Sequence, residues 1–142
     1  MSAAGLIGWY LRSWRLYAVF RGRSRRREIL VWHFGHLVLY LVFLALAFLG
    51  LASLSEEIGG ALTLGLTSFL YLYGLAALVP SLALTVRRLH DLNTSGLAAL
   101  LLLVPVVGLL FALYLLLAPG TPGPNRFGPP PPLTASGDAK EE

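Results

Sequence analysis

The sequence contains no cysteine, so it has neither a disulfide framework nor a thiolate metal site. Charge is also scarce: Asp, Glu, Lys and Arg make up 13% of the 142 residues, against roughly 25% in an average soluble domain. Hydrophobic residues account for 56% of the chain, and its mean hydropathy is +0.72. These values exclude an ordinary soluble domain and predict a membrane protein of at most one domain.

Acidic residues are few, and the net charge of +4 comes mainly from arginines gathered at one end of the chain. Seven of the ten arginines precede the first long apolar run: Arg12, Arg15, Arg21, Arg23, Arg25, Arg26 and Arg27. A basic block beside a membrane span is typical of a topology signal and of a contact with anionic lipid. We therefore expect the arginines to set the membrane topology and to contact anionic lipid, and we predict no nucleic-acid partner.

Three apolar runs contain no Asp, Glu, Lys or Arg: residues 29–51, 61–86 and 97–118. Each exceeds the roughly 20 helical residues that cross a hydrocarbon core of about 30 Å. Because backbone polar groups in lipid need partners within their own segment, each run is expected to be a helix. The predicted fold class is an all-α membrane protein with three transmembrane helices, preceded by an interfacial amphipathic helix.

The connections between the runs carry charges of opposite sign. Residues 52–60 carry two glutamates and no base, whereas residues 87–96 carry two arginines. Arginine-rich connections stay in the cytoplasm, so the N-terminus and the 87–96 loop are expected to lie inside.

The third run is interrupted by Pro105 and Gly108. The preferred interpretation is a kinked through-span, which places the C-terminus outside. The alternative is a re-entrant hairpin that returns the tail to the cytoplasm, since each half of the run is too short to span a bilayer at 1.5 Å per residue.

Two flanking segments complete the predicted organisation of 1–28, 29–118 and 119–142. Residues 1–28 form a basic amphipathic segment, with a helix expected over 5–20 that lies in the headgroup layer. Its polar stripe is Gly8, Arg12 and Arg15, and its aromatic residues are Trp9, Tyr10, Trp14, Tyr17 and Phe20. Residues 119–142 hold seven of the nine prolines, and the distal part of this tail is expected to be disordered.

The stretch VRRLHDLNTSG at 86–96 places two arginines, a histidine and an aspartate, which are costly to bury, between two apolar runs. One interpretation is a structured turn in which Arg87 and Arg88 reach lipid phosphates or pair with Asp91, while a nearby Asn, Thr or Ser caps the next helix. The other is a chemical site, in which His90 is an acid–base group that Asp91 orients.

A metal site is a weaker hypothesis. His33 and His36 are three residues apart and lie on one helix face, in the same predicted leaflet as His90, and three imidazoles can bind zinc. No carboxylate accompanies the first pair, however, and a histidine in a span is often a hydrogen-bond partner of another helix. The prediction is no metal and no cofactor.

Four segments resemble the domain of unknown function 805 family: FRGRSRRREILVW at 20–32, RRLHDLNTSG at 87–96, PVVG at 105–108 and PGTPGPNRFGPPP at 119–131. The residues that carry the resemblance are Phe20, Gly22, Arg23, Arg26, Arg87 to Asp91, Ser95, Gly96 and Asn125 to Gly128. The family has tryptophans where Leu97 and Ala98 stand, and the first two histidines lie outside its pattern. The resemblance implies a polytopic protein of the bacterial inner membrane with no established activity.

Together these observations predict a small scaffold or accessory subunit. Its cytoplasmic arginine-rich face would bind anionic lipid and a protein partner, either a second copy of the chain or another membrane protein. The alternative is a membrane-embedded enzyme or transporter for a lipid-linked or phosphate-bearing substrate. The candidate site residues are Gly22, Arg23, Arg26, Arg87, Arg88, His90, Asp91, Ser95, Gly96, Asn125, Arg126 and Gly128.

Overall fold

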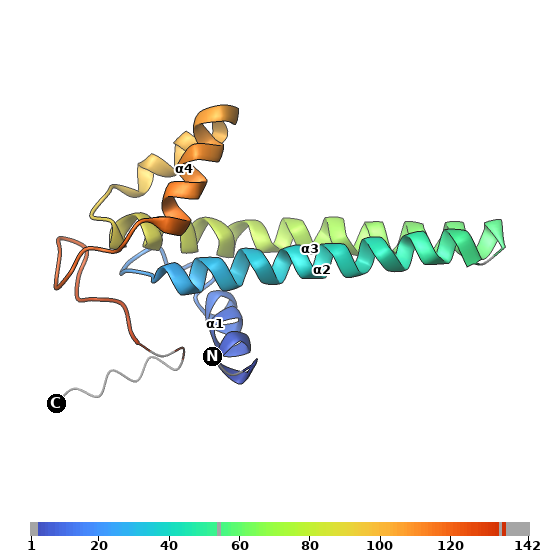
Figure 1. Ribbon diagram of the computed structural model, residues 1–142, viewed down its shortest axis with the longest axis horizontal. Helices are drawn as coiled ribbons and strands as arrows, with labels where there is room; N and C mark the ends of the chain where they lie inside the picture. The colour runs from blue at the N-terminus through green and yellow to red at the C-terminus, as the bar shows by residue number, and fades with distance from the viewer. Residues whose placement is uncertain (1–2, 54, 134, 136–142) are drawn as a thin grey trace. The chain divides into compact units, whose positions relative to one another are not determined.

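The computed structural model describes residues 3–53, 55–133 and 135, and within them the regular structure is entirely helical (Figure 1). The elements are α1 (Ala3–Arg15), α2 (Arg26–Ser53), α3 (Glu56–Asp91), the 3₁₀ helix η1 (Gly96–Leu103) and α4 (Pro105–Leu117). The all-α prediction is confirmed. The chain divides into two compact units, residues 1–32 with 79–142 and residues 33–78, so that both long helices pass through both units.

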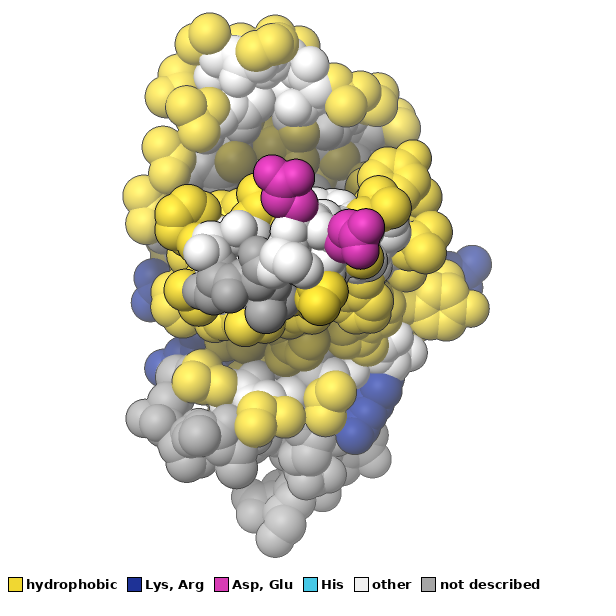
Figure 2. All heavy atoms as spheres, turned by 90° about the vertical axis from the view of Figure 1, so that its right-hand side faces the viewer, with side chains coloured by type: hydrophobic (Ala, Val, Ile, Leu, Met, Phe, Trp, Pro, Cys, Tyr) yellow, Lys and Arg dark blue, Asp and Glu magenta, His cyan; other side chains and the backbone are white. Residues whose placement is uncertain are grey.

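The unit of residues 33–78 is an antiparallel pair formed by α2 and α3. The pairing follows from contacts that move in opposite directions along the two helices: Phe43 stacks on Phe69 at 5.2 Å, and the Thr63 hydroxyl donates to the Ala47 carbonyl at 3.5 Å. Near the turn, a side chain on Gly59 would collide with backbone of α2. Figure 2 faces this turn and shows its acidic side chains among hydrophobic ones.

Two helices, α2 and α3, are long and apolar enough to cross a membrane, and α4 is a shorter apolar helix. Large apolar side chains of both long helices point outward, among them Leu44, Phe48 and Leu64. Such an outer surface fits hydrocarbon rather than water, because lipid imposes no cost on exposed leucine. The protein is therefore a membrane protein with about three apolar helices, as the sequence predicted.

The third apolar run is broken into two short helices and turns back on itself, which is the arrangement of the re-entrant alternative. Val104 is extended and Pro105 begins α4, where proline lacks the N–H that would continue η1. Gly108 lies directly against the backbone of Leu102, so the two short helices touch. The Arg88 Nε then donates to the Leu115 carbonyl at 2.8 Å, which brings the end of α4 back to the end of α3. At 1.5 Å per residue, α4 is also only about 20 Å long, too short to cross.

The predicted N-terminal helix is present as α1, although it ends at Arg15 rather than at residue 20. Three of its aromatic residues do not face the headgroup layer as predicted. Trp9 is buried, and Tyr10 and Trp14 contact Trp32 of α2 at ring distances of 5.2 and 5.4 Å. Trp32 is only 1% exposed and donates to a serine hydroxyl of α3. Tyr10 and Trp14 therefore pack their rings against the large apolar indole of Trp32 instead of against lipid headgroups.

The first half of the Pro-rich tail, residues 119–133, follows α4 and is described throughout. It contains an isolated β-bridge between Asn125 and Gly128. Most of the distal segment, for which the sequence predicts disorder, lies outside the described residues.

Candidate functional site

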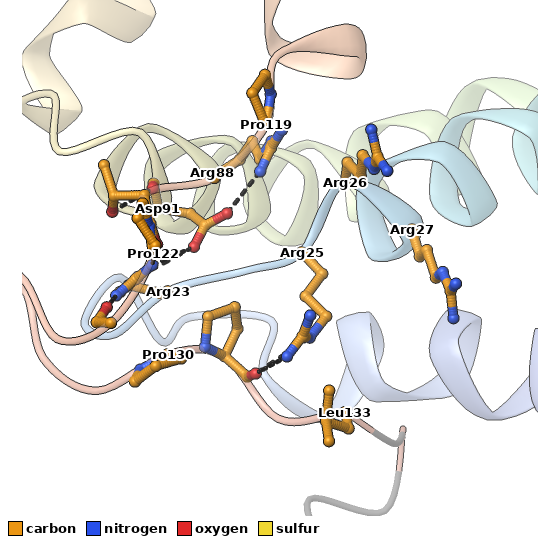
Figure 3. Close-up of a pocket in the computed structure, with 14 residues that line it drawn as sticks. Arg23, Arg25, Arg26, Arg27, Arg88, Asp91, Pro119, Pro122, Pro130 and Leu133 are labelled. Atoms are coloured by element: carbon orange, nitrogen blue, oxygen red, sulfur yellow. Dashed lines mark hydrogen bonds and ion pairs between the residues drawn. The ribbon is translucent and has the colours of Figure 1, made fainter.

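The centre of the candidate site is the carboxylate of Asp91, which binds one arginine with each oxygen. Its Oδ1 accepts from Arg23 Nε at 3.0 Å and lies 2.9 Å from Arg23 Nη2 in an ion pair, and its Oδ2 accepts from Arg88 Nη1 at 2.6 Å. Figure 3 shows both guanidinium groups converging on this carboxylate. One acid at the end of α3 thus joins the segment before α2 to α3 itself.

The remaining guanidinium donors of these two arginines bind main-chain carbonyls of the C-terminal part of the chain. Arg23 donates to the carbonyls of Thr121 and Gly123, both at 2.5 Å. Arg88 donates to those of Leu115 and Ala118, at the end of α4. Five N–H donors in a fixed fork suit arginine to this task, because it can bridge a carboxylate and several carbonyls at once.

A second carboxylate, Glu28 in the first turn of α2, organises the N-terminal segment. It accepts from Arg87 at 3.3 Å and from the Ser24 hydroxyl at 2.6 Å, and it pairs with Arg12 of α1 at 3.6 Å. Arg87 also donates to the carbonyls of residues 16 and 19, each at 2.9 Å. The adjacent arginines of the motif therefore face different partners: Arg87 fixes the N-terminal segment, and Arg88 fixes the C-terminal one.

Both arginines are buried, whereas one interpretation of the sequence had them reach lipid phosphates. Arg87 is 2% exposed and Arg88 is 0% exposed, and Arg23 and Asp91 are buried with them. Burial of a charge is tolerated only when the charge is paired and its donors are hydrogen-bonded. The alternative partner that the sequence suggested for these arginines, Asp91, is the observed one for Arg88.

His90 does not form a dyad with its neighbour Asp91, whose oxygens are occupied by arginine. Its Nδ1 lies 3.1 Å from the Gly22 carbonyl, and its ring stacks on Phe127 with centroids 3.9 Å apart and planes 7° apart. Gly22 has a φ of +81°, a conformation that suits glycine, and this turn presents its carbonyl to the imidazole.

The NRFG segment of the tail packs on the same helix end. Asn125 donates to the His90 carbonyl and to the Thr121 hydroxyl, each at 2.9 Å, and Arg126 donates to the Asn93 carbonyl at 2.9 Å. Thr121 in turn donates through its amide and its hydroxyl to the Asp91 carbonyl. The hairpin formed by η1 and α4 therefore brings the motifs at 20–26, 87–96 and 125–128 together in one unit.

The two motif residues that follow α3, Ser95 and Gly96, shape the main chain at the start of η1. Ser95 caps η1, and its hydroxyl accepts from the Leu97 amide at 3.4 Å. A Cβ on Gly96 would lie 2.8 Å from the side chain of Val86. Because glycine has no Cβ, the start of η1 can pack this closely against α3. The predicted cap is confirmed at Ser95.

Several residues of the site were not predicted from the sequence. Glu28 was visible as the one acid in a basic segment, a signal for an internal ion pair. Thr121 and Gly120 carried no such signal, because their roles depend on how the tail packs against Asp91.

Gly120 supplies a test of this packing. An added Cβ would overlap the carboxylate of Asp91, so Gly120→Ala is expected to lower the unfolding free energy by about 1–3 kcal/mol, a typical cost of overpacking. Gly60→Ala is the control, since Gly60 lies in α3 with no atom within 4 Å of the new methyl group. That change should be neutral or stabilising by up to ~1 kcal/mol. Thermal unfolding of both variants in detergent measures the difference, and equal melting temperatures would contradict the packing.

A pocket of about 430 Å³ lies beside the Asp91 cluster, between the start of α2 and the tail (Figure 3). Its charged lining consists of Arg23, Arg25, Arg26, Arg27, Arg88 and Asp91, and its apolar lining includes Pro119, Pro122, Pro130, Pro131 and Leu133. Arg25 donates to the carbonyls of Pro131 and Pro132 at 2.7–3.1 Å. Arg26 and Arg27 are exposed, and neither pairs with a carboxylate of the described chain.

Within the same described residues, no group of three His, Cys, Asp or Glu side chains is placed to hold a metal ion. His36 lies 3.1 Å from the Tyr73 hydroxyl, which is the interhelical hydrogen bond that the sequence offered as the alternative to a metal ligand.

The model of the family described as "Protein of unknown function (DUF805)" matches residues 17–129, a segment that contains all the motifs of the site. The chain belongs to this family. Two DUF805 relatives come from Escherichia coli (strain K12). Inner membrane protein YhaH is 38% identical over 127 residues, covering 89% of this chain and 98% of the relative. Inner membrane protein YhaI is 40% identical over 123 residues, covering 87% and 94%.

These similarities assign this DUF805 chain to the inner membrane, in agreement with its two long apolar helices. No solved structure matches the chain.

Proposed function

We propose that this DUF805 protein is an accessory membrane protein that binds anionic lipid through an exposed arginine face at the cytoplasmic surface. The observation that carries the proposal is a set of arginines that are exposed and unpaired with any described carboxylate: Arg15, Arg21, Arg26, Arg27 and Arg126. We call these five residues the arginine face. Each arginine near an anionic membrane surface contributes about 1 kcal/mol of attraction.

The distribution of charge along the two long helices supports a cytoplasmic position for this face. The arginines cluster before and at the start of α2, whereas Glu56 and Glu57, both exposed, begin α3 after the turn. Each helix is longer than the bilayer core is thick, so these groups belong to opposite membrane surfaces. Since arginine-rich segments are retained in the cytoplasm, we place the N-terminus inside.

The accessory role rests on how the polar motifs are used. The conspicuous charges of the 87–91 motif bind one another and main-chain carbonyls, which is a structural task. The alternative enzyme required Asp91 to orient His90, and the carboxylate is bonded to Arg23 and Arg88 instead. What the motif leaves available to a ligand is the arginine face and the pocket beside it.

The proposal predicts that anionic lipid stabilises the protein through the arginine face. Wild type is expected to melt at a higher temperature in nanodiscs with anionic lipid than in neutral nanodiscs. Arg15→Gln/Arg21→Gln should reduce this difference while keeping the melting temperature in neutral lipid. The matched control is Glu56→Gln/Glu57→Gln, which changes charge at the other end of the spans and should keep the difference. If wild type melted equally in both lipids, general binding of anionic lipid by the arginine face would be excluded.

A further inference from the structure

We infer that the arginine-lined pocket beside Asp91 is a specific binding site for the phosphomonoester head of a lipid. This inference rests on the proposed function for its membrane surface, but it adds a defined site and a ligand class. The arginine face attracts anionic lipid in general, whereas a pocket selects one headgroup.

The pocket holds more positive charge than the protein neutralises. Five arginines and one carboxylate line it, which leaves a formal charge of +4. Asp91 pairs with Arg23 and Arg88, and among the described residues it pairs with none of the other three arginines of the pocket. Among the described residues, the partners of Arg25 are the neutral carbonyls of Pro131 and Pro132. Such an excess of positive charge favours the binding of an anionic ligand in the pocket.

The position of the unpaired arginines favours an anion that sits at the start of α2. Arg26 is the first residue of this helix and Arg27 the second. The helix N-terminus carries a partial positive charge, which adds to that of the side chains. Figure 3 shows both residues on the side of the pocket away from Arg23. The side chains of Arg26 and Arg27 point in different directions and are exposed (Figure 3), so both would turn toward an anion bound beside Arg25, and the Asp91 ion pairs would stay in place.

A phosphomonoester fits this site better than a phosphodiester does. It carries about −1.5 to −2 charges at neutral pH and three strong acceptor oxygens. A phosphodiester carries a single negative charge and two free oxygens. Since arginine binds phosphate oxygens in pairs through its planar fork, three arginines can use all the oxygens of a monoester.

The apolar lining indicates that the ligand is an amphiphile. Four prolines and Leu133 form part of the wall, and Leu133 is 75% exposed. A volume of about 430 Å³ falls within the range of roughly 300–1,000 Å³ that is usual for small-molecule sites. A free phosphate ion would leave the apolar wall in water, whereas the glycerol and first acyl carbons of a lipid would cover it.

Binding to the full-length protein in detergent tests the inference. The probes are dioctanoyl phosphatidic acid, dioctanoyl phosphatidylglycerol, glycerol 3-phosphate and inorganic phosphate, each titrated by calorimetry. Phosphatidic acid is expected to bind saturably at one site and more tightly than the other three. The pocket variant Arg26→Gln/Arg27→Gln should weaken this binding by about tenfold or more, as loss of charge-assisted hydrogen bonds does. The comparison variant Arg15→Gln/Arg21→Gln removes the same charge from the arginine face outside the pocket, so it should weaken binding of phosphatidic acid less than the pocket variant does, and it should weaken binding of phosphatidylglycerol to the same extent.

The outcomes separate the pocket from the proposed function. Equal binding of phosphatidylglycerol, or equal weakening by the two double variants, would overturn the pocket and leave general attraction to anionic lipid standing. Equal binding of glycerol 3-phosphate or inorganic phosphate would overturn the lipid as the ligand. Pocket-dependent binding of phosphatidic acid, together with equal melting of wild type in neutral and anionic nanodiscs, would support the pocket while the proposed arginine face failed.

Discussion

Replacing Asp91 with asparagine is expected to cost about 3–5 kcal/mol of folding free energy, the usual effect of removing one partner from a buried ion pair. The carboxylate is the counter-charge of Arg23 and Arg88, both of which are buried. Asparagine keeps the shape and can still accept hydrogen bonds, but it leaves two guanidinium charges without compensation. The same change should loosen the tail, because both arginines also hold carbonyls of residues 115–123.

The measurement is the melting temperature of the purified protein in detergent, followed by size-exclusion chromatography after heating. Glu57→Gln is the matched control, since it removes an exposed carboxylate of the same chain and should cost less than about 1 kcal/mol. A protease-sensitivity assay of the tail distinguishes local loosening of the tail from unfolding of the whole protein. An Asp91→Asn protein as stable as Glu57→Gln would show that the buried pairs do not hold the fold together.

The two long helices were predictable from the sequence because the property that defines them is local. A run of more than 20 residues without a charged group can satisfy its backbone only as a helix when it lies in lipid. The third run has the same composition, and hydropathy does not distinguish a hairpin from a through-span. Pro105 marked the break, but the direction taken after it depends on bonds such as Arg88 to Leu115, which are 27 residues apart in the chain.

The candidate site could likewise be predicted from the sequence only in part. The motif arginines could be named from the sequence, and the possibility that they meet the NRFG segment followed from the re-entrant alternative. Their burial could not be predicted, because arginine is usually exposed and only its partners decide otherwise. Glu28 shows this clearly: one acid among seven arginines is a signal for an ion pair that the sequence analysis did not use, and the arginines that it meets are set by the packing of α1 and α3 against α2.

The absence of cysteine makes the membrane topology open to direct measurement, because a single introduced cysteine is the only thiol in the chain. Three exposed positions suffice: Arg21→Cys before α2, Ser55→Cys at the turn between the long helices, and Pro129→Cys in the tail. With the N-terminus inside and the third run re-entrant, a membrane-impermeant maleimide should label Arg21→Cys and Pro129→Cys only in inverted vesicles. It should label Ser55→Cys only in right-side-out vesicles. The expected effect is nearly all or none, since a charged reagent does not cross the bilayer.

The cysteine-free wild type is the control and should remain unlabelled in both preparations. The informative comparison is between the tail and the turn. If Pro129→Cys reacted on the same side as Ser55→Cys, the third run would cross the membrane, and the bonds from Arg23 and Asp91 to residues 121–123 could not form in the bilayer. The pocket would then lose the wall that the tail provides. If Arg21→Cys and Pro129→Cys reacted together on the outer side, the hairpin would stand but the arginine face would meet the wrong leaflet. The labelling pattern thus tests separately the two conditions on which lipid binding at this site depends.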